Sequence, residues 1–332
     1  MGGAFVGWGY AKENDMSEPL VHIQDFRMAF GDNTVINDLS FDVVAGETFG
    51  FLGSNGSGKT TTLRALLGIY QPTAGTLHIN GRTFEPSDGG RLGYLPEERG
   101  LYKKEPVIET MTYFGRLKGL DKQKARAWSL EYLERVGLAE KATTRLDKLS
   151  GGQQQKVQLG VTIMNSPELL ILDEPTKGFD PVNRRLLMDI IEDQRRAGAT
   201  VVMVTHQMEE VERLCDRVIL LKDGTSHAYG TVRDVQEQFG GTTYRVTHTG
   251  VVPPSHHYTV ASTQAMGEGQ VSELAPASGA DEATVLTELV SAGVPVSGFA
   301  TARTSLEEIF IRVYGADSLD EATQAETVGV GA

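Results

Sequence analysis

The sequence lacks disulfide chemistry, long hydrophobic runs and an excess of positive charge. Its 332 residues include one cysteine, Cys215, which excludes an intramolecular disulfide and is typical of a reducing compartment. The 44 acidic residues outnumber the 31 basic ones and give a net charge of -13, which opposes a general nucleic-acid partner. No apolar run approaches the roughly 18 to 20 residues that span a bilayer. We therefore expect any membrane contact to depend on a partner.

The two ends of the chain are poor in large apolar residues. Residues 1–17 are rich in glycine and lack the basic start and apolar core of a signal peptide. Residues 317–332 are small and acidic. We expect both segments to be disordered, and Met16 is a candidate for the natural start. The length between them suffices for one large and one small domain.

A glycine-rich segment between a predicted strand and a predicted helix carries the clearest chemical signal. It fits the pattern G-x-x-x-x-G-K-[ST] and consists of Gly53, Ser54, Asn55, Gly56, Ser57, Gly58, Lys59 and Thr60, with Thr61 opening the helix. Such glycines let backbone N–H groups converge on phosphate oxygens at a helix N-terminus. Lys59 would reach the β- and γ-phosphates and Thr60 would coordinate Mg²⁺. Chance alone gives this pattern in about one per cent of chains of this length.

Further polar groups follow predicted elements downstream. The apolar run 168–172 ends in Asp173 and Glu174, as expected where a buried parallel strand reaches the edge of a sheet. Asp173 can bind Mg²⁺ through water, and Glu174 can orient or deprotonate the attacking water. His206 follows the predicted strand 200–205. A lone histidine is usually structural, but this one lies where a second strand meets the same edge.

Ser150 is predicted to cap a helix whose first residues are Gly151, Gly152 and Gln153. The glycines leave backbone N–H groups open to an anion, although Ser-Gly-Gly taken alone is only a flexible turn. Phe30 precedes the turn between predicted antiparallel strands at 21–28 and 39–44. Phe30 is expected either to stack on an adenine ring or to pack in the core as a strand aromatic.

The remaining segments predict an α/β protein with a small α+β appendage. Strands are expected at 76–80 and 92–95, helical structure over 107–149, and a helix at 183–196. Cys215 is expected to be buried on a helix covering 212–218. Beyond Gly240, strands are predicted at 243–247, 257–261 and 294–300, with helices at 281–291 and 305–313. We expect this appendage to form its own core, so that a chain cut after Gly240 stays folded and keeps every phosphate-contacting motif.

Four segments in chain order resemble the motifs of the ATP-binding subunit of an ABC transporter, over about residues 20–235. They are the phosphate loop, residues 149–153, the run 170–175 that contains Asp173 and Glu174, and residues 205–206. The resemblance implies that Phe30 stacks on adenine and that His206 contacts the γ-phosphate. It implies that Asp180 belongs to the loop that links two ATP sites. The signature that meets the γ-phosphate on the opposite subunit would comprise Ser150, Gly151, Gly152 and Gln153.

The resemblance also implies the architecture and the partners. The fold would be a P-loop, RecA-like α/β core with an antiparallel β subdomain and a helical subdomain at about 100–160. The ATP-binding domain would cover 18–238 and the small C-terminal α+β domain 239–316. Two such subunits, identical or homologous, would enclose two ATP with Mg²⁺ and drive a separate transmembrane permease. The subunit would lie peripherally on the cytoplasmic face of the membrane, with no nucleic acid.

Two positions depart from the family pattern. Glu97 stands where glutamine is usual, at a place expected to touch Mg²⁺ and the attacking water, and Phe179 replaces leucine before Asp180. The alternative for Glu97 is an ion pair with Arg99 or Arg91 on a solvated loop. Residues 94–102 nevertheless resemble the subgroup that works with ABC-2-type exporters of drugs, sodium or lipids. Residues 304–310 resemble the C-terminal domain of the same subgroup, where a role in dimer contact or regulation is expected.

Two other functional classes share the phosphate loop. A soluble ABC-type ATPase acting on ribosomes or DNA is disfavoured by the acidic charge and by the single nucleotide-binding module. The 113 residues between Lys59 and Asp173 also leave no room for a long coiled coil. A small-molecule kinase is disfavoured because the segment 149–153 has no use in such an enzyme. The transported substrate is not encoded here, because its contacts would belong to the permease.

Overall fold

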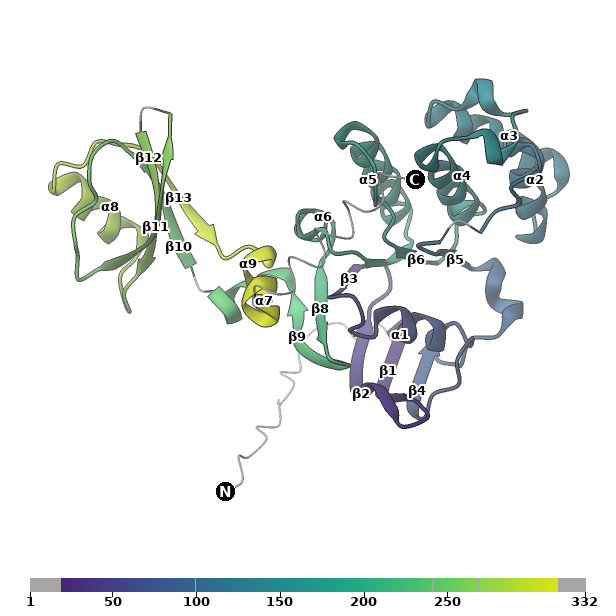
Figure 1. Ribbon diagram of the computed structural model, residues 1–332, viewed down its shortest axis with the longest axis horizontal. Helices are drawn as coiled ribbons and strands as arrows, with labels where there is room; N and C mark the ends of the chain where they lie inside the picture. The colour runs from purple at the N-terminus through teal and green to yellow at the C-terminus, as the bar shows by residue number, and fades with distance from the viewer. Residues whose placement is uncertain (1–18, 99, 241, 268, 316–332) are drawn as a thin grey trace.

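The computed structural model describes residues 19–98, 100–240, 242–267 and 269–315. The expected disorder of residues 1–17 and 317–332 and the role of Met16 therefore lie outside the described residues. Within the described residues the strands form three sheets. The sheet that carries the phosphate loop lies between the other two sheets (Figure 1). No helix of this described part is long and apolar enough to cross a membrane.

The first sheet is antiparallel and comprises β1 (Val21–Phe30), β2 (Asn33–Val43) and β4 (Ala74–Ile79), in the order β2-β1-β4. Alternating side chains of β1, such as Val21 and Ile23, are buried while their neighbours are more exposed, as expected for a sheet with one covered face. Phe41 of β2 stacks on Phe49 with ring centroids 5.3 Å apart. This contact joins the first sheet to the central one.

The central sheet has the order β5-β6-β7-β3-β8-β9. Its strands are β3 (Thr48–Gly53), β5 (Leu92–Leu95), β6 (Leu169–Asp173), β7 (Thr200–Val204), β8 (Arg217–Lys222) and β9 (Thr225–Thr231). All neighbours are parallel except β8 and β9. Every residue of β3, β6 and β7 is buried, because both faces of the sheet are covered. The predicted α/β class with a parallel core is confirmed.

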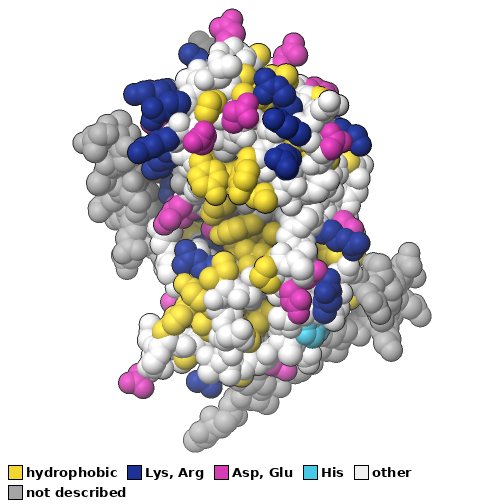
Figure 2. Space-filling model, turned by 90° about the vertical axis from the view of Figure 1, so that its right-hand side faces the viewer, with side chains coloured by type: hydrophobic (Ala, Val, Ile, Leu, Met, Phe, Trp, Pro, Cys, Tyr) yellow, Lys and Arg dark blue, Asp and Glu magenta, His cyan; other side chains and the backbone are white. Residues whose placement is uncertain are grey.

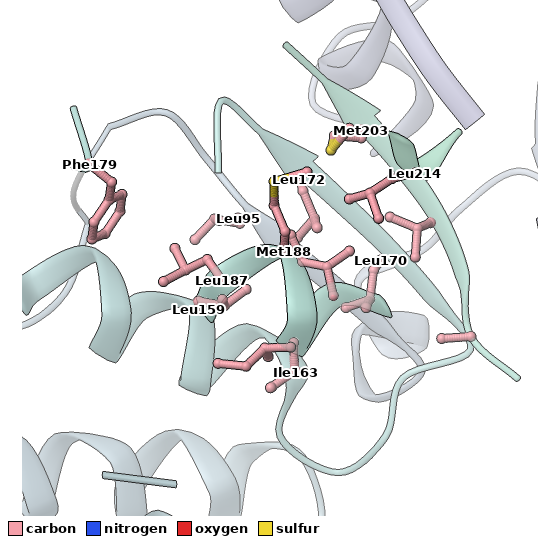
Figure 3. Packing of buried hydrophobic residues seen from close by; sticks show 14 of the residues in the cluster. Leu95, Leu159, Ile163, Leu170, Leu172, Phe179, Leu187, Met188, Met203 and Leu214 are labelled. Atoms are coloured by element: carbon pink, nitrogen blue, oxygen red, sulfur yellow. The ribbon is translucent and has the colours of Figure 1, made fainter. Parts of the chain in front are cut away.

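Two apolar cores lie on the two faces of the central sheet. On one face, Ile171 and Val202 pack with residues of the first sheet and of α1 (Lys59–Leu66). On the other face, Leu170, Leu172 and Met203 pack against helices (Figure 3). Those helices include α4 (Gly151–Ile163), α5 (Pro181–Arg196) and α6 (Met208–Leu214). We call this second group the helix-side core.

The helical arm is formed by α2 (Val107–Leu117) and α3 (Lys122–Arg135), which pack on each other and on α4. Close packing depends on small residues, since a side chain on Gly160 would overlap the ring of Tyr132. Short 3₁₀ helices occupy Pro86–Gly90, Ala139–Lys141 and Leu146–Lys148. This arm matches the helical region expected over 107–149.

The predicted helix over 212–218 is wrong at its end. α6 stops at Leu214, and buried Cys215 follows as its C-cap. The Asp216 carboxylate then accepts a hydrogen bond from the Thr48 N–H at 2.9 Å. That contact draws the chain alongside β3, and β8 begins at Arg217.

The appendage is a four-stranded antiparallel sheet with one helix. It contains β10 (Thr242–His248), β11 (Tyr258–Met266), β12 (Gly269–Pro276), β13 (Val296–Arg303) and α8 (Glu282–Ser291), with strand order β11-β12-β10-β13. Its core comprises Tyr244, Val246, Tyr258, Leu274, Val285, Leu289 and Val294. The strand β12 was not predicted from the sequence.

The last helix, α9 (Leu306–Tyr314), leaves this sheet and packs on α6 and on α7 (Val232–Gly240). Leu306 and Ile309 are 3% and 1% exposed and belong to the helix-side core. Figure 1 shows α7 and α9 between the appendage and the central sheet. The expectation that the appendage forms a core wholly its own is therefore wrong for α9, because the apolar face of this helix is covered by the ATP-binding part of the chain.

Candidate functional site

The glycine-rich loop joins the end of β3 to α1. Gly58 has φ of 106° and is the N-cap of α1, and a Cβ there would collide with the Ile36 side chain. A Cβ on Gly53 would lie 2.5 Å from the Leu221 carbonyl oxygen. Both positions thus require glycine, and the loop exposes the N-terminus of α1 to a ligand.

Lys59 lies at the centre of this loop. Its Nζ donates hydrogen bonds to the carbonyl oxygens of Gly53, at 2.7 Å, and Ser54, at 2.9 Å. Burial lowers the pKa of Lys59, while the carboxylates of Glu174, Asp173 and Glu97 act to raise it. When a phosphate group and a metal ion bind, the buried Lys59 ammonium and the carboxylates can each replace their present contacts with a stronger partner of opposite charge.

Two carboxylates follow β6. Asp173 is 4% exposed, and burial, followed by the charges of Glu174 and Glu97, raises its pKa to about 6. Glu174 adopts φ of 49°, and its N–H donates to the Val204 carbonyl oxygen at 2.8 Å. A left-handed conformation of a non-glycine residue stores strain, and here it turns the carboxylate away from the strand.

His206 holds the carboxylate of Glu174. The Oε1 atom of Glu174 lies 2.8 Å from Nδ1 of His206 and accepts the His206 backbone N–H at 3.1 Å. The hydroxyl of Thr205 donates to Oε2 at 3.4 Å. The end of β7 therefore fixes the orientation of a side chain that belongs to β6.

These groups line one cavity of about 690 Å³. The sequence-predicted residues that line it are Ser54, Asn55, Gly56, Gly58, Lys59, Thr60, Thr61, Glu97, Asp173, Glu174 and His206. Gly53 and Ser57 belong to the loop without facing this cavity. The Ser57 hydroxyl is buried and has no hydrogen-bond partner among the described residues.

Sequence reasoning missed several residues of the wall. They are Val35, Lys177, Arg184, Gln207, Met208, Glu209, Glu307 and Phe310. The position of Lys177, three residues after Glu174, and of Gln207 and Met208, directly after His206, could have indicated them. Nothing in the local sequence places Glu307 and Phe310 of α9 beside the phosphate loop.

A buried polar network connects α5 and α6 beside the cavity. The hydroxyl of Thr176 donates to both carboxylate oxygens of Glu210, at 2.6 and 2.8 Å. Arg184 Nε lies 3.6 Å from Glu210 Oε1. Burial raises the pKa of Glu210, and the Thr176 hydrogen bond acts against that rise. The network ties the segment after Glu174 to the helix that follows His206.

Glu97 forms an ion pair with Lys177, whose Nζ lies 3.0 Å from its Oε1. Arg91 instead approaches Glu168, at 3.9 Å, so the expected alternative of a pair with Arg91 is wrong. Arg99 lies outside the described residues. Glu97 and Lys177 are both about half exposed, and they close one side of the cavity.

The other predicted site residues lie away from this cavity. Phe30 is 46% exposed and meets Tyr70 edge-on at 5.4 Å, so it is not packed in the core. Ser150 caps α4 and forms a capping box with Gln153, which follows Gly151 and Gly152. Asp180 caps α5 by accepting the N–H groups of Val182 and Asn183, each at 3.0 Å. The predicted helix start at Ser150 is confirmed.

The oxygen atoms present fit a hard divalent cation in part. Thr60, Asp173 and Glu97 supply a hydroxyl and two carboxylates to the cavity, the donor types that Mg²⁺ prefers. Among the described residues no group of three or more histidine, cysteine or acidic side chains is arranged to hold a metal by itself. Such an ion would therefore take its remaining ligands from the phosphates of a nucleotide.

Comparison with known proteins agrees with this geometry. Residues 36–177 match the family described as ABC transporter, and residues 230–314 match the C-terminal domain of the ATP-binding protein DrrA1-3-like family. The uncharacterized ABC transporter ATP-binding protein MJ1023 of Methanocaldococcus jannaschii is 43% identical over 219 residues. That alignment covers 66% of this chain and 80% of the relative.

Two relatives have named roles. The linearmycin resistance ATP-binding protein LnrL of Bacillus subtilis is 34% identical, covering 68% of this chain and 73% of the relative. The Nod factor export ATP-binding protein I of Paraburkholderia xenovorans is 38% identical, covering 65% and 72%.

Solved structures show the same fold. An ATP-binding subunit of an ABC transporter superposes with a TM-score of 0.62 at 29% identity, covering 66% of this chain and 93% of that chain. The fold of cbiO1 from Clostridium perfringens, at 23% identity, also matches, with a TM-score of 0.58 and coverage of 66% and 91%. The chain belongs to the ABC transporter family, as an ATP-binding subunit that is an ATPase of the exporter-related type and works with a separate permease.

Proposed function

We propose that this chain hydrolyses ATP·Mg²⁺ in a composite site formed by two copies and thereby drives an exporter. The observation that carries the proposal is the single cavity in which the phosphate loop, Asp173, Glu174 and His206 meet. The similarity to LnrL and to the Nod factor export protein supports an outward direction of transport.

Each residue has a distinct role in this proposal. Lys59 leaves the carbonyl oxygens of Gly53 and Ser54 to bind the β- and γ-phosphates. Thr60 and Asp173, with Glu97 at the rim, would hold Mg²⁺, which when bound offsets negative charge on the phosphates. Phe30, which is exposed and meets Tyr70 edge-on, would stack on the adenine.

Glu174 is the proposed general base. Its Oε1 atom is held by His206, while Oε2 accepts the longer hydrogen bond from Thr205 at 3.4 Å, so Oε2 is the oxygen that we assign to the proton of the attacking water. The water oxygen forms the new bond to the γ-phosphorus, the bond to the β-phosphate oxygen breaks, and ADP leaves. His206 positions the carboxylate and directs its ring toward the γ-phosphate.

The signature residues Ser150, Gly151, Gly152 and Gln153 do not line the cavity of their own chain. The helix that they begin presents backbone N–H groups, which favour an anion. We propose that they contact the γ-phosphate bound by a second subunit and that Asp180 links the two sites.

The helical arm offers the proposed contact surface for the permease. Tyr113 and Leu117 of α2 are 45% and 63% exposed, and Tyr102, which precedes α2, is 55% exposed. The rings of Tyr102 and Tyr113 pack with Phe114. Apolar side chains gather on the face of the molecule shown in Figure 2, with both basic and acidic side chains around them. Exposed aromatic groups of this kind favour a protein interface. Docking there would place the chain on the cytoplasmic side of the membrane.

A mixing experiment tests the composite site. Lys59→Ala removes the phosphate contact, and Ser150→Arg obstructs the signature, so each variant alone should hydrolyse almost no ATP. A mixed dimer contains one intact site, made of the loop of one chain and the signature of the other. We expect the mixture to regain roughly a quarter of the parent rate, because random exchange gives half mixed dimers with one good site each.

The control is the melting temperature of each variant, which should match that of the parent. A mixture that stays as inactive as its components would contradict a site shared between two copies. Activity of Ser150→Arg alone at the parent rate would remove the signature from the site.

A further inference from the structure

Helix α9 bridges two parts of the nucleotide site. At its beginning, the N–H of Leu306 donates to Glu212 Oε1 at 2.6 Å. Glu212 belongs to α6, which begins two residues after His206. Phe310 and Glu307, in the middle and first turn of α9, line the same cavity as Lys59 and His206.

The end of α9 contacts the strand that supports the phosphate loop. The hydroxyl of Tyr314 donates to the carbonyl oxygen of Leu221. Leu221 is paired with Gly53, the first residue of the loop, in the parallel ladder of β8 and β3. Lys222 fixes the same turn of α9, because its Nζ donates to the Val313 carbonyl oxygen at 2.6 Å.

The position of the Tyr314 ring is strongly constrained. It stacks on Phe310 with ring centroids 4.2 Å apart, and Lys222 Nζ lies 5.6 Å from its centre. Burial raises the pKa of Tyr314 to about 12, and hydrogen bonds with Ser54 oppose that rise. The phenol is therefore neutral at physiological pH and remains a donor beside the loop.

We propose that Tyr314 is a positioning residue for ATP binding, holding the Gly53–Ser54 end of the phosphate loop in place from the last helix of the appendage. Glycine-rich loops pay a large conformational entropy on ordering, and an outside contact that fixes one end reduces that cost. Phe310 supports the ring of Tyr314 and closes the cavity. ATP affinity thus depends on the position of α9, so that a movement of the appendage can change nucleotide binding.

The inference rests on the nucleotide site proposed above, and it predicts a specific change in binding. Tyr314→Phe keeps the stacked ring and removes the hydroxyl. We expect the dissociation constant for a fluorescent ATP analogue to rise roughly three- to tenfold, the worth of one or two lost hydrogen bonds. The turnover number at saturating ATP should change less than about twofold, because neither Glu174 nor His206 is altered.

Tyr258→Phe is the matched control. The hydroxyl of buried Tyr258 also donates to a backbone carbonyl, that of Pro253, at 3.0 Å, but it lies in the appendage core. This variant should lose similar stability while its ATP affinity stays at the parent value. Equal affinity for the parent and Tyr314→Phe would overturn the inference, as would equal shifts in both variants.

A double-mutant cycle identifies the partner through which Tyr314 acts. If Tyr314 acts through Ser54, the effect of Tyr314→Phe on ATP affinity should largely disappear in a Ser54→Ala background. Fully additive effects would contradict action through Ser54. Failure of the parent to bind ATP, or binding that survives Lys59→Ala, would instead refute the proposed nucleotide site.

Discussion

At the scale of single residues, the site is organised around unbalanced charge. Burial opposes the positive charge of Lys59 and raises the pKa of Asp173 to about 6. Glu174 and Glu97 lie close enough to affect both groups. The triphosphate and a divalent cation would bring matching charges of opposite sign, so the protein is arranged to gain from binding both together.

Glu97 should restrain the resting enzyme. It adds a negative charge near the expected γ-phosphate and holds Lys177 at 3.0 Å. Glu97→Gln should raise basal ATPase turnover roughly two- to fivefold at low salt, with a smaller effect at high salt. Steady-state hydrolysis measured over a range of Mg²⁺ concentrations checks this. Glu98→Gln is the neighbouring control and should leave turnover unchanged. Weakened Mg²⁺ affinity without faster turnover would show that Glu97 acts as a metal ligand alone and does not restrain the resting enzyme.

Lys118 should make stability depend on pH in the alkaline range. Its Nζ donates to the Thr162 carbonyl oxygen at 2.7 Å, and burial lowers its pKa to about 8. Between pH 8 and about 10.4 the unfolded chain keeps a proton that the folded chain has released, so the free energy of unfolding should rise with pH. Below pH 8 Lys118 is protonated in both states, so the cost of burying its charge is fully present and the free energy of unfolding is lowest.

Lys118→Arg tests this effect, because arginine stays protonated throughout the range. The difference in unfolding free energy between the parent and this variant should grow by about 1 to 3 kcal/mol from pH 7.5 to 10. Urea unfolding at several pH values measures it, with Lys104→Arg on the surface as control. Parallel pH curves for the parent and Lys118→Arg would show that Lys118 titrates normally.

At the scale of elements, the success of sequence reasoning followed local signals. The strand Leu169–Asp173 was predictable because burial on both faces leaves an unbroken apolar run, and α4 was predictable from its cap at Ser150. The strand β12 was missed, since it mixes glycine, serine and glutamate with its apolar residues. The extent of α6 was misjudged because a contact of Asp216 with β3 ends it.

The site shows the same division. Lys59, Asp173 and Glu174 were predictable as a group because their residue types follow strands that end at one sheet edge. The placement of Phe310 and Glu307 was not, since it results from the packing of Leu306 and Ile309 on the helix-side core. Contacts distant in sequence leave no local pattern.

The packing of α9 on the helix-side core should affect ATP binding more than the packing within the appendage core does. Ile309→Ala and Leu289→Ala each remove a fully buried side chain, from the helix-side core and the appendage core respectively. Each should lower the unfolding free energy of its part by about 2 to 4 kcal/mol. ATP titration should show weaker binding for Ile309→Ala alone. Comparable loss of affinity in Leu289→Ala would argue that the appendage acts through its sheet.

At the scale of the whole molecule, the ATP-binding part and the appendage are not independent. A cut after Gly240 would also remove α9 and expose the apolar surface of the helix-side core on which Leu306 and Ile309 pack. From this packing we expect the truncated chain to be less stable than the parent, in contrast to the expectation from the sequence that it stays a folded ATPase. The nucleotide site is incomplete in another sense too, because the proposed signature residues of the same chain lie away from its cavity.

The central claim is that Glu174 hydrolyses ATP between two closed copies of the chain. Glu174→Gln keeps the side-chain shape and an oxygen that can accept the His206 N–H, but it removes the base. Light scattering with ATP and Mg²⁺ should show a stable dimer of this variant, and turnover should fall by about 10² to 10⁴. Adding Lys59→Ala should return the protein to its nucleotide-free state of assembly. Hydrolysis by Glu174→Gln at near the parent rate, or no change of assembly when ATP binds, would contradict the account.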